Sequence, residues 1–177
     1  MAYKSPLWIS AWFALSIPVI FWDAGYCLMR PRSMRGGDLH WIWSPYSLYQ
    51  DVDYVYGIPA LERGDGFTNA QSVLNLVENF LNIWYLYLAH AQGSAVAPLV
   101  GFASVIMTLS KTVLYLLVEY FCGQCSTGHN DLATLFWLWI VPNGLWILFP
   151  SACLYYFGGT LANTLRRAEK GNKKKAQ

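Results

Sequence analysis

The chain has 177 residues, of which 55% are hydrophobic, 17% aromatic and only 12% charged, and its formal net charge is +2. An average soluble domain is about 25% charged, so this composition argues against a soluble fold. No basic patch interleaved with aromatic side chains occurs, so we expect no nucleic-acid partner.

Instead, the apolar residues gather into four runs, each long enough for the roughly 20 residues that a membrane span requires. The first predicted helix covers residues 6–28. It is too long for the core of a signal peptide and lacks a small-residue cleavage site, so we expect it to be retained. Pro18 should kink it. Asp23 places a carboxyl group inside the membrane, where acids are costly and usually functional.

Residues 29–69 form a long polar connection that is rich in arginine and in aromatic rings. Loops of this length are usually functional or disordered, and the aromatic content argues against disorder. We therefore expect the loop to lie at the membrane interface, with its rings at headgroup depth, and to cap the mouth of a cavity. Asp51 and Asp53 either reach that mouth or, as we favour, are solvated loop acids.

The second predicted helix, residues 70–91, carries one polar stripe on an otherwise apolar surface. Residues three and four apart share a face of a helix, and this spacing joins Gln71, Asn75, Glu78, Asn82 and Tyr85. Glu78 either serves a function or only pairs with another buried group. The four polar neighbours on its face favour a function.

The third predicted helix, residues 96–121, has a second stripe, made of Ser104, Thr108, Lys111, Tyr115 and Glu119. Lys111 falls near the middle of the membrane and should need an acidic partner, with Glu78 the first candidate and Asp23 the second. Glu119 lies near the helix end, where a structural role is expected.

A Cys-x-x-Cys pair, Cys122 and Cys125, follows this helix and precedes His129. A zinc site normally takes four ligands in two pairs, so we expect a disulfide or two free thiols rather than a metal. Asp131 or Asn130 then fits the N-cap of the last helix.

The fourth predicted helix covers residues 132–157, with Pro142 as a possible kink. Trp139, Asn143, Trp146 and Pro150 share one face. We expect Asn143 to find a partner across the bundle, whereas Trp139 either packs between helices or lines a site.

The basic tail, residues 166–177, places the C-terminus in the cytosol by the positive-inside rule. Four spans then put both termini there, although Arg30, Arg32 and Arg35 in the first loop oppose this orientation. Residues 174–177 resemble the dilysine retrieval signal of endoplasmic-reticulum membrane proteins, with a merely solvated tail as the alternative.

These patterns predict an all-α integral membrane four-helix bundle with an internal ligand cavity, in one domain over residues 1–165. From a rise of about 1.5 Å per residue, Asp23 and Glu78 fall at similar depths, so one cavity can contain both. We expect these two to be catalytic. The expected substrate-binding residues are Asn75, Asn82, Tyr85, Lys111, Tyr115, Trp139, Asn143 and Trp146.

Such a cavity supports acid–base chemistry without a cofactor or metal. A desolvated carboxyl group can keep its proton and act as a general acid, while a second carboxylate accepts a proton. Aromatic faces stabilise a cation that forms in between. The chemistry would shift a double bond, open an epoxide or close a ring.

Three parts of the sequence together resemble the emopamil-binding (EXPERA) family. They are Glu78 in its polar stripe, Val-Leu-Tyr-Leu-Leu-Val-Glu119, and Asn143-Gly-Leu-Trp146-Ile-Leu-Phe-Pro150. The resemblance covers residues 8–160. It implies a four-helix membrane domain around a ligand cavity, often a homodimer, in which residues matching Glu78, Asn143 and Trp146 line the site.

The sequence departs from the sterol isomerase of that family, whose first helix carries a His-x-x-x-Glu pair. Here Phe-Trp-Asp23 is more similar to the sigma-2 receptor branch, and Lys111 has no counterpart in the isomerase. We therefore expect a multi-pass endoplasmic-reticulum isomerase or cyclase for a terpenoid, sterol or polyketide-like substrate. The alternative is a non-catalytic binder of sterols or cationic amphiphiles; a protein scaffold has only the long loop in its favour.

Overall fold

The computed structural model describes residues 3–175, with side chains through residue 173. Every element in this part of the chain is helical, so the all-α prediction is confirmed. Four helices are long, and their bounds are α1 Leu7–Leu28, α4 Phe67–Leu86, α5 Ala97–Phe121 and α7 Val141–Lys175. Helix α7 continues a short helix, α6 Leu132–Leu135, through a π-helical turn at Phe136–Ile140.

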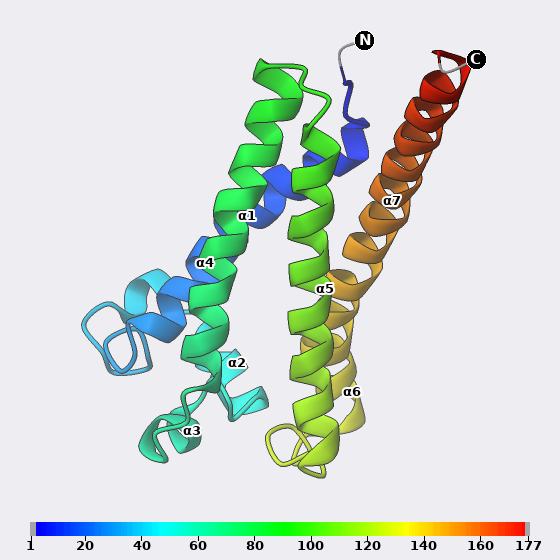
Figure 1. Cartoon of the computed structure of the whole chain (residues 1–177). Helices are drawn as coiled ribbons and strands as arrows, with labels where there is room; N and C mark the ends of the chain where they lie inside the picture. The colour runs from blue at the N-terminus through cyan, green and yellow to red at the C-terminus, as the bar shows by residue number, and fades with distance from the viewer. Residues whose placement is uncertain (1–2, 176–177) are drawn as a thin grey trace.

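The long helices run side by side, except for α1 (Figure 1). Helix α5 lies between α4 and α7, and α1 crosses behind them at an oblique angle. Both described chain ends lie at one end of the molecule, and the connections on either side of α2–α3 and between α5 and α6 lie at the other.

Three helical segments are long and apolar enough to cross a membrane: Leu7–Leu28, Ala97–Phe121 and Leu132–Lys173. Helix α4 is not among them, because Ser72, Glu78, Asn79 and Asn82 lower its hydropathy. These four side chains are buried, whereas the exposed surface of α4 is apolar. The apolar surface of α4 therefore faces outward although its average hydropathy is low.

Two predicted boundaries were wrong. The fourth helix does not end near residue 157 but continues to Lys175 through the tail that was expected to be separate. Its last turns consist largely of Leu, Arg, Ala, Glu and Lys, which are good helix formers, and Glu169 pairs with Lys173 at 2.6 Å one turn later. The second helix begins at Phe67, whose N–H donates to the Asp65 side chain. The dilysine-like residues 174–177 lie outside the residues whose side chains are described.

The long loop is ordered, as its aromatic content predicted. It contains a 3₁₀ turn at His40–Trp43 and two short helices, α2 Tyr46–Val52 and α3 Ile58–Glu62. Tyr46 stacks on Tyr26 with ring centroids 3.9 Å apart, and Trp43 donates to the carbonyl of Trp22. These contacts fix α2 against α1.

The helical segment from α6 into α7 continues through Pro142 without a break. A proline lacks an N–H and disrupts the preceding turn of an α-helix, and the π-helical turn at Phe136–Ile140 lies immediately before Val141–Pro142. A widened turn of this kind accommodates the missing hydrogen bond.

Near the termini, the long helices meet in an apolar core around Gly101 of α5. Phe13, Tyr85 and Phe157 come from three different helices and are fully buried here. A Cβ on Gly101 would lie 2.6 Å from the Phe157 ring and 3.0 Å from that of Tyr85. The absence of a side chain at residue 101 therefore sets how closely α5 approaches α4 and α7.

We predict that Gly101→Ala destabilises the fold by about 1–3 kcal/mol, the usual cost of overpacking a core. Thermal unfolding in detergent micelles measures it. The matched control is Gly144→Ala on exposed α7 surface, where a Cβ meets no atom within 4 Å. Equal melting temperatures for the two variants would contradict the close packing.

Candidate functional site

The candidate site is a pocket of about 490 Å³ in the half of the molecule away from the termini. Its walls come from α1, α2, α4, α5 and the helix from Leu138 into α7. Of the residues predicted from sequence, it is lined by Asp23, Asn75, Glu78, Lys111, Tyr115, Asn143 and Trp146. Both predicted catalytic acids therefore face the same pocket.

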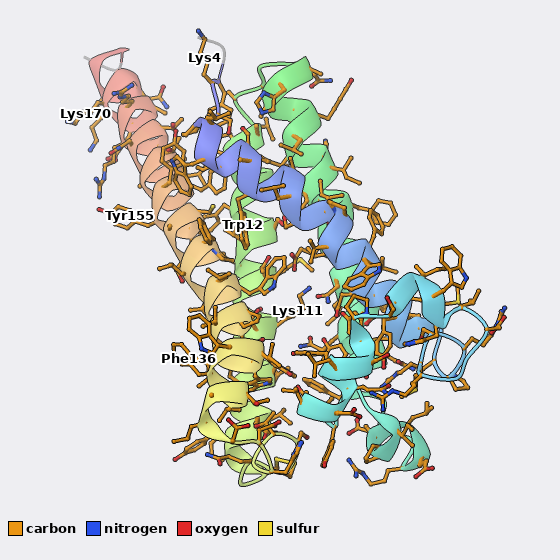
Figure 2. All side chains as sticks on the ribbon, turned by 180° about the vertical axis from the view of Figure 1, so that it is seen from behind. Lys4, Trp12, Lys111, Phe136, Tyr155 and Lys170 are labelled. Carbon is orange, nitrogen blue, oxygen red and sulfur yellow. A yellow bond between two sulfur atoms is a disulfide. The ribbon has the colours of Figure 1, made fainter. Side chains whose placement is uncertain are left out.

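A buried ion pair crosses the pocket wall between α4 and α5. Lys111 Nζ lies 2.6 Å from Glu78 Oε2, and the two side chains are only 10% and 2% exposed. The same ammonium donates to Asn75 Oδ1 at 2.6 Å, and Gln71 donates to the Lys111 carbonyl. The predicted pairing of Lys111 with Glu78 is confirmed. Three residues of the α4 stripe therefore contact the same lysine. Figure 2 labels Lys111 near mid-height of the molecule.

Asp23 lies on a different wall and has a different partner. The hydroxyl of Tyr46, on α2, donates a short hydrogen bond to Asp23 Oδ1. The Trp22 and Tyr46 rings are 5.0 Å apart, and Tyr49 and Tyr56 also line the pocket. The long loop therefore supplies an aromatic wall beside Asp23.

Asp53 is the residue that the sequence interpretation missed. It was expected to be solvated, like Asp51, but it is 1% exposed. Its Oδ2 accepts a short hydrogen bond from the Tyr115 hydroxyl and another from Trp139 Nε1 at 3.1 Å, and its Oδ1 accepts from the backbone N–H of Val55. Asp53 thereby fixes the Tyr115 ring that lines the pocket.

Asp51, two residues earlier, is exposed and paired with Arg35 at 2.8 Å. Both aspartates occur in the same Gln-Asp-Val-Asp-Tyr segment, and only the fold separates them. The end of α2 at Val52 turns Asp53 inward toward α5.

Three predicted binding residues do not line the pocket. Tyr85 belongs to the apolar core with Phe13 and Phe157, and its hydroxyl contacts that of Ser5 at 2.5 Å. Asn82 accepts from Ser104 at 2.5 Å and donates to Asn79. The polar stripe of α4 therefore has two parts. Helix α1 packs across α4 and covers the part of the stripe nearer the termini, so only the other part faces the pocket.

Trp139 is the third residue that does not line the pocket. It contacts Tyr115, which does line the pocket, and Asp53. Its indole donates to Asp53 and to the Tyr115 hydroxyl at 2.9 Å, so it acts in packing and orientation. Asn143 was expected to find a partner across the bundle, but its amide donates to the Trp139 carbonyl of its own helix at 2.8 Å. That carbonyl lies one turn earlier, where the π-helical turn ends.

Cys122 and Cys125 form a disulfide, one of the two states expected for them. His129 Nε2 donates to the Asp51 carbonyl oxygen at 2.7 Å, and the His129 ring stacks on Tyr54. Glu119 has the expected structural role: its carboxylate accepts the backbone N–H groups of Ser126 and Thr127. Asp131 caps the last helix through the N–H groups of Ala133 and Thr134.

This loop also holds the wall of the site in place. The Ser126 carbonyl accepts from Tyr54 N–H at 3.1 Å, and Asn130 donates to the Val52 carbonyl at 2.8 Å. The α5–α6 connection is therefore tied to the residues on both sides of Asp53.

Comparison with known proteins gives no match, whether with protein-family models, with curated proteins or with solved structures.

We predict that removing either partner of the ion pair destabilises the fold more than removing both. Lys111→Met or Glu78→Gln alone should cost about 3–5 kcal/mol, because each leaves a buried charge uncompensated. The double variant should recover most of that loss. Thermal unfolding of the four proteins measures the coupling, and additive losses would contradict a buried, paired interaction.

We also predict a pH dependence from Asp53. Burial raises the pKa of its carboxyl above the usual 3.8, while the Tyr115 hydrogen bond works against that rise. The folded protein therefore keeps this proton at a pH where the unfolded chain has lost it. The free energy of unfolding should fall as pH rises from about 4, by about 1.4 kcal/mol per unit until Asp53 ionises in the folded state.

Asp53→Asn cannot ionise and should flatten this part of the curve, whereas the exposed control Asp51→Asn should not. Unfolding curves measured in steps between about pH 4 and pH 7 test this. Parallel curves for wild type and Asp53→Asn would show that Asp53 does not titrate with folding.

Proposed function

We propose that the chain is a membrane-embedded, cofactor-independent isomerase or cyclase for a hydrophobic small molecule of the terpenoid, sterol or polyketide-like class. The observation that carries the proposal is that carboxyl groups from α1 and α4 line one aromatic-rich pocket, and only the α4 carboxyl is paired with a lysine. Two acids in unlike surroundings are the usual arrangement for acid and base roles.

In this proposal the domain is a four-helix bundle in the membrane, with α4 as the fourth span. The apolar exposed face of α4, formed by residues such as Val73, Val77, Phe80 and Trp84, suits contact with lipid. Its polar residues face the neighbouring helices, as membrane-embedded polar groups do. An even number of spans also agrees with the position of both chain ends at one end of the molecule.

The roles of the two acids follow from their partners. Glu78 is paired with an ammonium, which favours its carboxylate form, so it accepts a proton. Asp23 accepts a hydrogen bond from a neutral phenol rather than from an ammonium. Such a bond favours the carboxylate, but in this proposal desolvation in the pocket favours the neutral acid more strongly, so Asp23 holds a proton and donates it. The Trp22 and Tyr46 rings beside Asp23 stabilise positive charge that develops at the carbon next to the one that is protonated.

The domain is proposed to belong to the EXPERA family and to reside in the endoplasmic reticulum with both termini in the cytosol. Lys4 and Lys170 lie at the same end of the molecule (Figure 2), as expected if basic residues mark the cytosolic face. Arg32 and Arg35 oppose this orientation, but they are paired with Asp38 and Asp51. The positive charge that these arginines contribute to their side of the membrane is therefore partly neutralised. Pairing as a homodimer is proposed from the resemblance.

A non-catalytic binder of cationic amphiphiles is the second candidate. The aromatic wall beside Asp23 favours it, because rings and a carboxylate together attract an amine. The two functions differ in what Asp23 does: it donates a proton in one and pairs with a ligand cation in the other.

We predict that Asp23→Asn and Glu78→Gln each lower turnover at least about 100-fold, the usual contribution of a general acid or base. The purified protein in lipid nanodiscs is incubated with lipid extract from cells that express it, and mass spectrometry with chromatography detects new isomers of equal mass. Glu62→Gln, an exposed acid outside the pocket, is the control.

Full turnover in either variant would refute the assigned roles. If the wild type forms no isomer but binds N,N-dimethyldodecylamine, and Asp23→Asn does not, the binder is the function.

A further inference from the structure

Lys111 is more than a partner for Glu78. An ammonium group has three N–H donors. One donates to Asn75 Oδ1 at 2.6 Å. Nζ also lies 2.6 Å from Glu78 Oε2, which forms an ion pair with it but accepts no hydrogen bond; even if a second donor turns to Glu78, a third is unused. No other acceptor for Lys111 is found among the described residues, and Lys111 lines the pocket. One donor of a nearly buried cation is therefore left for whatever occupies the pocket.

Two walls of the pocket differ in polarity. Thr108 and Thr112 line it beside Lys111, but the hydroxyls of both donate to carbonyls of α5 itself. The Lys111 ammonium is thus the strong donor on this wall. Another wall has Asp23 with the Trp22 and Tyr46 rings. A cation in a site of low dielectric repels positive charge and attracts an oxygen that carries negative charge.

We propose that the substrate carries a ketone oxygen that accepts a hydrogen bond from Lys111, and that its double bond lies toward Asp23. The reaction is then the conversion of a β,γ-unsaturated ketone to its α,β-unsaturated isomer. This inference rests on the proposed function and names the substrate class of the same site.

The bond changes balance without a further reactant. Asp23 donates its proton to the γ carbon, and the electrons of the old double bond form the new C–H bond. Glu78 removes a proton from the α carbon, and the electrons of that C–H bond form the new α,β double bond. The hydrogen bond from Lys111 draws electron density onto the carbonyl oxygen and so makes the α proton more acidic. One proton returned from Glu78 to Asp23 through solvent completes the cycle.

The arrangement explains why a lysine and a glutamate are neighbours in a site that handles a hydrophobic molecule. The base and the group that polarises the carbonyl must act on adjacent atoms of the substrate. An ion pair with a separation of 2.6 Å presents both groups together. It also keeps the ammonium charge balanced when the pocket is empty.

Binding and turnover test the proposal separately, with the full chain in nanodiscs. The binding probes are androst-4-ene-3,17-dione and the hydrocarbon in which CH₂ groups replace both carbonyls. Binding is measured by quenching of tryptophan fluorescence. The wild type should bind the ketone on the order of 10- to 100-fold more tightly, as a hydrogen bond from a charged donor implies. Ser110→Ala, on the exposed face of α5, should keep this preference.

Lys111→Met should lose the preference. Because that variant leaves Glu78 unpaired, the double variant Lys111→Met/Glu78→Gln is tested as well, and it should also bind the two probes alike. The turnover probe is androst-5-ene-3,17-dione, whose isomerisation is followed by the absorbance of the conjugated ketone. Lys111→Met should lower that rate at least about 10-fold.

The ketone substrate and the isomerase function can be refuted independently. Equal binding of ketone and hydrocarbon by the wild type would overturn the ketone proposal, even where extracts yield isomers that depend on Asp23 and Glu78. A ketone preference that depends on Lys111, without formation of any isomer from probe or extract, would support carbonyl recognition and reject the proposed isomerase.

Discussion

The ion pair between Lys111 and Glu78 is the interaction on which the rest of the site depends. Placing either charge alone among apolar helices is costly, and a single unpaired ion loses most of its hydration without compensation. In the ion pair each charge compensates the other, at a contact between α4 and α5. The partners of the lysine then decide which α4 residues reach the pocket, because Gln71 and Asn75 both serve it. A stable charge pair therefore fixes the register of two long helices.

The second constraint comes from the long loop, which acts as part of the pocket rather than as a linker. Tyr46 on α2 hydrogen-bonds Asp23 of α1, and Asp53 just after α2 hydrogen-bonds Tyr115 of α5. One short helix thus connects two of the long helices through two acid–phenol contacts. The disulfide loop supports it from outside through Tyr54 and Asn130. The wall around Asp23 consequently differs in chemistry from the wall with the ion pair: it has aromatic rings and a phenol in place of a full positive charge.

Helical periodicity predicted the long helices and the Lys111–Glu78 pair, because spacing assigns a helical face and a buried charge requires an opposite one. Periodicity could not predict that the α4 stripe divides, since this depends on where α1 crosses α4 and where Phe13 and Phe157 fill the space around Tyr85. It also could not separate Asp53 from Asp51, because the burial of Asp53 is set by contacts with Tyr115 and Trp139, more than 60 residues away in sequence. The end of α7 was misjudged because the apolar character of the sequence ends before the tail, whereas helix propensity continues through it.

The central claim is that two acids of one pocket exist in opposite protonation states, because one is paired with a lysine and the other is desolvated beside a neutral phenol and has no salt bridge among the described residues. Infrared difference spectroscopy of the purified protein near neutral pH measures this directly. The account predicts that Asp23→Asn removes a carboxylic-acid C=O stretching band and that Glu78→Gln removes a carboxylate band instead. If Asp23→Asn removed only a carboxylate band, or Glu78→Gln removed an acid band, the assignment of donor and acceptor would be contradicted.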